Sequence, residues 1–233
     1  MRRCLISRTL LYAFRRQAVK PNLERNEIKI ISKMNIASIS KIYLASKSPR
    51  RRELLNQIGV EFEILTIDIP EEVAENEDYL SYSKRVCQEK AQAGWNYMLA
   101  QNLPIHPILT ADTEVVYQDE VLGKPENYAA AFAMWRKLAG HKHLVITTIT
   151  LKYFDFEKSV TTQSWVYFDE LSDDEIHAYL QTGDYQDKSG SYGIQSFAGQ
   201  YIQKIDGCFY SVMGLPLNAV RNLRKELADY VAK

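Results

Sequence analysis

The sequence has few of the residues that mark several classes of protein. Its three cysteines, Cys4, Cys87 and Cys208, are odd in number and far apart, which predicts neither a disulfide framework nor a zinc site and indicates a reducing compartment. It has no run of about 18 apolar residues, so no membrane-spanning helix is expected. With 233 residues, 46% of them hydrophobic and 25% charged, the composition is that of a globular protein.

Histidines are also scarce, and the four present show no spacing typical of metal ligands. His141 and His143 are separated by one lysine, which could in principle bring both to one metal ion. A solvated turn explains this pair more simply. A histidine-based metal site is therefore not predicted.

The net charge of zero hides an uneven distribution of charge. Residues 1–33 contain nine basic and two acidic side chains, which leaves 20 basic against 27 acidic in the remainder, a net charge of −7. An acidic body argues against general nucleic-acid binding. Any basic patch within it must then be local.

The amino-terminal segment, residues 1–36, stands apart from the rest of the sequence. Its first 20 residues are rich in arginine and free of acids, a composition typical of an organelle transit peptide. The alternative is a mis-assigned start, since Met34 stands just before the first convincing strand. We expect one domain over residues 37–233.

Strands and helices alternate along this domain without strict βαβ regularity. Apolar and β-branched runs predict strands at 41–46, 60–69, 107–122, 143–154 and 159–171, the last two paired with each other. Helices are expected near 48–58, 79–99, 127–140, 172–182 and 217–232, with Ser48, Asn127 and Ser172 as N-caps. The pattern predicts a mixed α/β fold with one long central sheet.

The segment "LASKSPRRRELL" (44–55) places three arginines in the first turn of a helix, where the helix dipole disfavours positive charge. A bound polyanion would explain them. Free backbone N–H groups at the helix start, the hydroxyls of Ser46 and Ser48, and the guanidinium groups of Arg50 and Arg51 can together hold phosphate. The alternative is that the arginines extend into solvent and Ser48 acts only as a cap.

Asp112 interrupts the otherwise apolar or β-branched run "LTADTEVV". A carboxylate within a strand near the core requires a cation or a network of hydrogen-bond donors. It could bind a divalent metal or accept a proton from water. A turn aspartate bonded to Thr113 is the equally simple alternative.

Two further stretches contain residues that could contact a ligand. Lys124 lies between Gly123 and Pro125, although a solvated loop lysine is the commoner explanation. The glycine-rich "DKSGSYGIQ" places Asp187, Lys188 and Gln195 where the backbone can approach a ligand closely. A glutamine amide can read a base edge, but the segment fits a hairpin turn as well.

Taken together, "LASKSPRRRELL", "ADTEVV", "LGKP", "DKSGSYGIQ" and "VMGLPL" resemble the Maf family of nucleoside triphosphate pyrophosphatases. The resemblance covers about residues 41–225. It implies the two-lobed Maf/ITPase-like fold around a cleft, and hydrolysis of a nucleoside triphosphate between the α and β phosphates with a divalent cation, Mg²⁺ or Mn²⁺. It also implies a homodimer.

The resemblance assigns a role to each matching residue. Asp112 matches the proton acceptor, and Glu71 matches the metal-associated acid, although Glu72 is close enough to compete. The expected phosphate-binding residues are Ser46, Ser48, Arg50, Arg51, Arg85, Lys90 and Lys124. Arg50, Thr113 and Gln195 match the positions that select the base in the branch acting on dTTP and UTP.

This chain departs from the family pattern at a few positions. Glu114 stands where an apolar residue is usual, and Ser196 replaces a glycine directly after Gln195. Ser189 and Ser191 replace alanines. Because Ser196 adjoins Gln195, these departures bear most on the residues that select the base.

The leading hypothesis is a cytoplasmic enzyme that removes dTTP, UTP or modified pyrimidine triphosphates from the nucleotide pool, with no nucleic-acid or membrane partner. A mitochondrial location is the alternative if residues 1–33 are a transit peptide. A pyrophosphatase of 7-methyl-GTP or another purine nucleotide would share the mechanism and differ in the base pocket. A non-catalytic nucleotide-binding regulator of cell division is the rival from another class.

Overall fold

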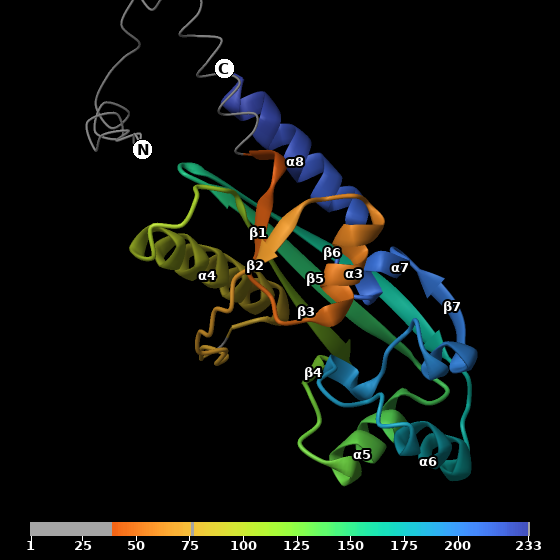
Figure 1. Cartoon of the computed structure of the whole chain (residues 1–233). Coiled ribbons are helices and arrows are strands. Elements are labelled where there is room, and N and C mark those ends of the chain that lie inside the picture. Colours follow the sequence, from red (N-terminus) through yellow and green to blue (C-terminus); the bar gives the residue numbers. More distant parts are fainter. Residues whose placement is uncertain (1–38, 76, 233) are drawn as a thin grey trace, which may run out of the picture.

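The computed structural model describes residues 39–75 and 77–232. The predicted amino-terminal segment, residues 1–36, therefore lies outside the described residues. The described chain forms a seven-stranded mixed sheet flanked by helices, in the order β2-β1-β3-β5-β6-β7, with β4 paired to β3 (Figure 1). The strands are β1 (Ile42–Leu44), β2 (Phe62–Ile64), β3 (Ile108–Tyr117), β4 (Glu120–Leu122), β5 (Lys142–Tyr153), β6 (Phe156–Phe168) and β7 (Ile202–Asp206). The mixed α/β prediction is confirmed.

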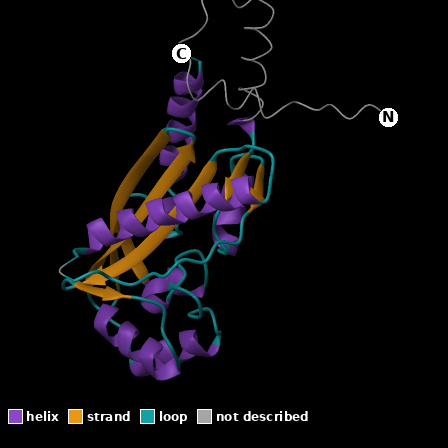
Figure 2. Ribbon diagram, turned by 90° about the vertical axis from the view of Figure 1, so that its left-hand side faces the viewer, coloured by secondary structure: helices purple, strands orange, loops and turns teal. Residues whose placement is uncertain are grey.

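Helices cover both faces of the sheet. They are α3 (Pro49–Gln57), α4 (Tyr79–Ala100), α5 (Tyr128–Leu138), α6 (Asp173–Gln181), α7 (Phe209–Val212) and α8 (Leu217–Val231), with short 3-10 turns η1 (Ser189–Ser191) and η2 (Phe197–Tyr201). The long helix α4 runs across one face, and α3, α7 and α8 lie on the other (Figures 1 and 2). Among the described residues, no helix is long and apolar enough to cross a membrane.

Local signals placed most helix starts correctly. Asn127 accepts a hydrogen bond from the Ala130 backbone N–H at 2.9 Å, and Ser172 with Glu175 forms the predicted capping box. Ser48 is different: it occupies the N-cap position of α3, but its side chain makes no capping bond. The expected N-cap position is confirmed, but no capping hydrogen bond from the Ser48 side chain is formed.

The sheet holds two large apolar cores, which correspond to the two lobes in Figure 1, and a smaller cluster of Val116, Leu144 and Ile146. The first, around β1, α3, α4 and α8, contains Ile108, Leu109, Ile149 and Leu151 from the long strands. The second, around α5, α6 and the glycine-rich segment, contains Val115 and Val145 from the same strands and Trp135 from α5. Between these cores β3 and β5 carry polar residues: Asp112, Thr113, Glu114, Thr147 and Thr148.

His143 is a buried histidine in the second lobe, with 0% of its surface exposed. Its Nε2 lies 2.7 Å from the Tyr192 hydroxyl, and no other ionisable partner compensates a charge, so burial lowers the pKa of His143 to about 3. His143 is therefore neutral in the folded chain. It is buried whereas His141 is exposed, so the structure does not bring the two together as a metal-binding pair.

This burial makes folding sensitive to acid. Because the folded pKa lies below the unfolded value of 6.5, the unfolded chain binds the extra proton first, and stability falls as pH drops below about 6.5. We expect His143 to account for a loss of about 2 kcal/mol between pH 8 and pH 5. Urea titrations at both pH values should show a smaller loss for His143→Gln, which keeps a partner for Tyr192 and cannot titrate. An unchanged difference between the two pH values would assign the acid sensitivity to other groups.

Candidate active site

The polar residues between the two cores lie at an open stretch of strand β3. Parallel β1 pairs with β3 through Ile108 and Leu109, and antiparallel β4 joins β3 from Val115 onward. In the part of the chain that the structure describes, residues 110–114 between them pair with β5 alone. The turn that follows β1 begins beside this opening, where Ala45 donates to the Leu109 carbonyl at 2.9 Å. Ligands of α/β sheets usually bind at such strand ends.

Alternation along β3 sends neighbouring side chains to opposite faces of the sheet. Asp112 faces α4, where it meets Lys90, whereas Thr113 faces the side of α3 and α7, where it meets Arg51. Asp112 and Thr113 both belong to the stretch of β3 that pairs with β5 alone among the described residues. The opening therefore gives one ligand access to residues on either side of the sheet.

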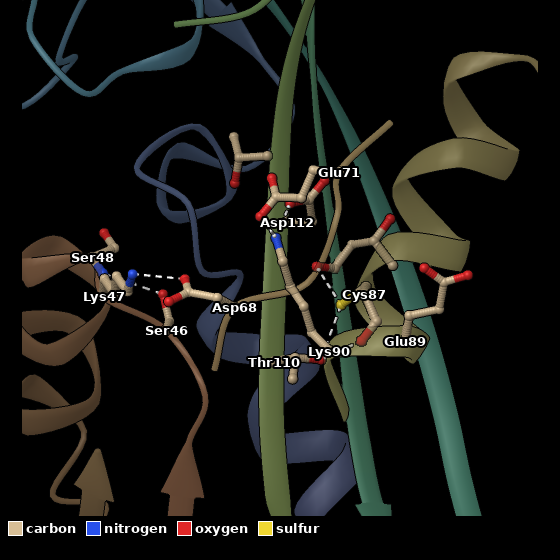
Figure 3. Close-up of polar contacts among 12 residues, drawn as sticks. Ser46, Lys47, Ser48, Asp68, Glu71, Cys87, Glu89, Lys90, Thr110 and Asp112 are labelled. Atoms are coloured by element: carbon tan, nitrogen blue, oxygen red, sulfur yellow. Dashed lines mark hydrogen bonds and ion pairs between the residues drawn. The ribbon is translucent and has the colours of Figure 1, made fainter. Parts of the chain in front are cut away.

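Three of the predicted residues form an ion-pair cluster on the α4 face. Lys90 donates to Asp112 Oδ1 at 2.8 Å and lies 2.9 Å from Glu71 Oε1, so its ammonium group sits between the two carboxylates (Figure 3). The Asp112 and Lys90 side chains are 8% and 13% exposed. Burial lowers the pKa of Lys90, but the charge of Asp112 and the bonds to both carboxylates outweigh it, and the net pKa is raised. Lys90 therefore stays charged.

Asp112 also has an oxygen with nothing bound to it. Its Oδ2 is buried and has no hydrogen-bond partner among the described residues. A buried acceptor left unpaired is costly, and at a functional site it indicates a ligand, ion or water that the folded chain is built to receive. The turn-aspartate alternative, with Asp112 bonded to Thr113, is not what the structure shows, because the Asp112 bond goes to Lys90.

Glu114 belongs to the same cluster, although it was not predicted as a site residue. It is 8% exposed and lies two positions after Asp112 on the same face of β3. Burial first, and then the negative charge of Asp112, raise the pKa of Glu114 to about 8. The two-residue period of a strand was a signal that could have found it.

The donor set suits a hard divalent cation only in part. Asp112 and Glu71 supply carboxylate oxygens, which Mg²⁺ and Mn²⁺ prefer, and the unpaired Asp112 Oδ2 is free to accept one. Within residues 39–75 and 77–232, however, no group of three or more His, Cys, Asp or Glu side chains is gathered as a metal site. Two carboxylates fit a cation that takes its other ligands from water and substrate phosphates.

On the other face, Arg51 cross-links three segments that are distant in the sequence. Its Nε donates to the Gly214 carbonyl at 2.8 Å, Nη1 to Ser46 Oγ at 3.0 Å, and Nη2 to Thr113 Oγ1 at 3.1 Å. Thr113 in turn lies 3.0 Å from Thr147 Oγ1. Arg51 thus has most of its donors engaged within the protein, and it fixes the place of Thr113 and Ser46.

Shortening this cross-link should weaken the fold. Arg51→Lys keeps the charge but loses the planar set of donors, so we expect the free energy of unfolding to fall by about 2 kcal/mol. Urea denaturation measures this loss. The matched control is Arg52→Lys, because Arg52 has no hydrogen-bond partner among the described residues. Equal unfolding midpoints for the two variants would contradict the cross-linking role.

Arg50, unlike Arg51, makes no hydrogen bond or ion pair with any residue that the structure describes. Burial lowers its pKa, and the charges of Asp184 and Glu53 act in the opposite direction. Arg50 therefore points toward the second lobe, where Asp184 accepts hydrogen bonds from Tyr179 and Ser196. Its donors are free for a ligand.

The two remaining motifs meet in the second lobe. The Gly190 N–H donates to the Gly123 carbonyl at 3.2 Å, which places "LGKP" beside the glycine-rich segment. Gly190 has a φ of +69°, and an added Cβ would lie 2.8 Å from Val115, so the close approach to β3 requires glycine. Lys124 and Gln195 are exposed, and neither has a hydrogen-bond partner among the described residues. Instead of the alternative hairpin, this segment forms short 3-10 turns.

Arg85 is engaged with carboxylates and a carbonyl. It contacts both oxygens of Glu77 at 2.7 Å, Glu89 at 3.1 Å and the Glu72 carbonyl at 2.8 Å. Sequence reasoning assigned no role to Glu77 or to Tyr82, whose hydroxyl donates to the Glu71 carbonyl at 3.1 Å. No local pattern marks these two residues.

Comparison with known proteins agrees with this geometry. The family model described as "Maf-like protein" matches residues 41–227. A dTTP/UTP pyrophosphatase of Chromobacterium violaceum is 41% identical over 187 residues, which are 80% of this chain and 94% of that protein. One from Dechloromonas aromatica is 38% identical over 195 residues, 80% of this chain and 97% of that protein. Among solved structures, the Staphylococcus aureus Ham1 protein matches with a TM-score of 0.38 and 10% identity, covering 56% of this chain and 72% of that chain, too slight a similarity for further argument.

Proposed function

The chain belongs to the Maf-like protein family, and we propose from this membership and the site that it hydrolyses nucleoside triphosphates, dTTP and UTP first among them, to the monophosphate and pyrophosphate. The observation that carries the proposal is the buried, unpartnered Oδ2 of Asp112 at the open edge of β3. A nucleotide-pool enzyme of this kind removes triphosphates that would otherwise be incorporated by polymerases. This is the role expected from the sequence.

In the proposed reaction, Asp112 accepts a proton from a water molecule as that water attacks the α-phosphorus. The bond from the α-phosphorus to the bridging oxygen breaks, and pyrophosphate leaves with that oxygen. Lys90 orients the Asp112 carboxylate through its 2.8 Å bond. The structure supports this role because the second carboxylate oxygen, Oδ2, makes no hydrogen bond to any described residue.

The phosphate tail carries about four negative charges, which the protein must neutralise and position. Arg50 and Lys124 are suited to this task because their donors are not used within the described chain. Ser46, Ser48 and the N–H groups at the start of α3 lie where β1 ends. Arg51 supports this region from within through its bond to Ser46.

We propose that Glu71 and Asp112 hold the divalent cation, Mg²⁺ or Mn²⁺, when it is bound. The cation would supply neutralisation of charge on the phosphate oxygens. Lys90 now bridges the same two carboxylates, so its ammonium group must share them with the cation or move aside. Glu72 is less suited, because it is the Glu71 carboxylate that meets Lys90 beside Asp112.

For the base, we propose contacts from Arg50, Thr113 and Gln195. Thr113 is held in place by Arg51, and Gln195 is exposed at the second lobe. Ser196 departs from the family glycine, and its hydroxyl is occupied by Asp184 and by the Gly193 carbonyl. The serine therefore has a partner of its own and leaves the neighbouring Gln195 amide available.

Purified protein with Mn²⁺ and a panel of dTTP, UTP, CTP, ATP, GTP and 7-methyl-GTP tests this function. We expect pyrophosphate, and no single phosphate, from dTTP and UTP. Preferred hydrolysis of 7-methyl-GTP would move the chain to the purine branch. Saturable binding without pyrophosphate would instead support a nucleotide-binding regulator.

We propose that the enzyme acts in the cytoplasm. The free thiols of Cys87 and Cys208 support a reducing compartment. A mitochondrial location remains the alternative, and it depends on residues 1–33, which lie outside the described part of the chain.

A further inference from the structure

The side chain of Arg85 lacks the free donors that a phosphate ligand would need. A guanidinium group has five N–H donors in a fixed plane. Nε and Nη2 bind the two oxygens of Glu77, Nη2 also binds the Glu72 carbonyl, and Nη1 binds Glu89. At least four donors are therefore used, two of them in the parallel bidentate arrangement that is strongest for arginine and carboxylate.

All of these contacts except the Glu89 pair go to the loop between β2 and α4. The Glu77 side chain is 11% exposed and also accepts the Ala74 N–H at 3.0 Å, so the ion pair is built into a folded loop. Arg85 donation lowers the pKa of Glu77 to about 2, which keeps the pair ionised at any assay pH near neutrality. The described residues of the loop, 65–75 and 77–78, form no helix or strand of their own to hold it.

The same loop carries Glu71. Arg85 binds the carbonyl of the next residue, Glu72, and the Glu71 carbonyl accepts a hydrogen bond from the Tyr82 hydroxyl at 3.1 Å. The Arg85 guanidinium lies 5.6 Å from the centre of the Tyr82 ring. The Glu71 carboxylate then reaches Lys90 at 2.9 Å, five residues beyond Arg85 on α4.

We propose that Arg85 is a positioning residue that fixes the loop against α4 and thereby sets the place of the Glu71 carboxylate beside Lys90 and Asp112. This assignment deepens the proposed function and rests on it. It differs from the expectation that Arg85 lines the phosphate cleft. A residue that orients a metal-associated carboxylate changes metal affinity, whereas a phosphate-binding residue changes nucleotide affinity.

The test measures the two affinities separately. Binding of Mn²⁺ alone is followed by the electron paramagnetic resonance signal of free Mn²⁺, without nucleotide, for the full chain and for Arg85→Gln and Arg85→Lys. We expect Mn²⁺ affinity to fall about tenfold in both variants, since lysine restores charge but not the bidentate pair. The KM for dTTP at saturating Mn²⁺ should change by less than about twofold.

A double-mutant cycle tests whether the effect passes through Glu71. Glu71→Gln should weaken Mn²⁺ binding by itself, and adding Arg85→Gln should weaken it no further. Glu77→Gln should reproduce the Arg85 effect, because it removes the other half of the bidentate pair. Arg136→Gln is the control, since it removes an arginine from an ion pair, with Asp173 3.2 Å away, that joins α5 to α6 and not the loop to α4.

Three results would overturn the proposal: unchanged Mn²⁺ affinity in the Arg85 variants, an increase in the dTTP KM at least as large as the loss of Mn²⁺ affinity, or additive losses in the double mutant. Circular dichroism confirms that each variant is folded before it is measured. Because Mn²⁺ binding is read without nucleotide, a wild-type chain that released no pyrophosphate would refute the proposed function and leave this test readable.

Discussion

Asp112→Asn is expected to reduce pyrophosphate release from dTTP about a thousandfold, because an amide cannot accept the proton that a general base removes from water. The fold should survive, since the asparagine oxygen can still accept the Lys90 hydrogen bond and Lys90 keeps Glu71 at 2.9 Å. Turnover and the urea midpoint are measured together, so that loss of activity is separated from loss of folding.

The control for this variant is Asp155→Asn, an exposed aspartate at the turn between β5 and β6. It removes the same charge far from the open edge of β3 and should leave turnover unchanged. If Asp112→Asn kept near wild-type turnover with unchanged stability, Asp112 would not be the base. In that case Glu114, the neighbouring buried carboxyl, would be the first residue to examine.

The second large effect is expected for Lys90→Met, which leaves two carboxylates without the cation between them. Breaking a largely buried ion pair by removing one partner is expected to lower the free energy of unfolding by about 3 kcal/mol. Loss of the ammonium group that orients Asp112 should also reduce turnover about a hundredfold. Denaturant melts and initial rates at pH 8 check both expectations.

The stability of Lys90→Met should depend on pH, because removing Lys90 changes how easily a buried carboxyl group binds a proton in the folded chain. Burial raises the pKa of Glu114 to about 8 and the charge of Lys90 acts to lower it, so without Lys90 the Glu114 carboxyl is protonated still more easily in the folded chain. The loss of stability of Lys90→Met relative to the wild type should therefore shrink as pH falls from 8 toward 5. The double variant Lys90→Met/Asp112→Asn should regain part of the lost stability at pH 8. A double variant no more stable than Lys90→Met would show that the ion pair contributes little.

Much of the fold could be read from the chain because its signals are local. The capping box at Ser172 and Glu175 depends on bonds within one turn of helix, and the pairing of β5 with β6 depends on two adjacent runs joined by a short turn. The strand expected at 60–69 shows the limit of this approach, since only Phe62–Ile64 forms a strand. Beyond Ile64 the parallel neighbour β1 has ended, so the backbone has no partner to continue the ladder.

The candidate site, like the fold, could be predicted from the sequence only in part. The residue types and their order identified Asp112, Arg50, Lys124 and Gln195 as candidates. Among the described residues, Arg50, Lys124 and Gln195 have no hydrogen-bond partner, and Asp112 has one oxygen, Oδ2, without a partner. Glu114 could have been added from the period of the strand alone. These assignments depend on chemistry and sequence spacing, which the chain carries in itself.

The partners of each charged side chain were decided by the tertiary structure. Arg50 and Arg51 are adjacent in the sequence, yet Arg51 binds Gly214, 163 residues away, whereas Arg50 stays free of such contacts in the described chain. Arg85 likewise turns to Glu77 because the loop folds back onto α4. Arginine binds phosphate and carboxylate with the same donors, so composition cannot tell the two apart. Only packing, which brings distant segments within hydrogen-bonding distance, selects between them.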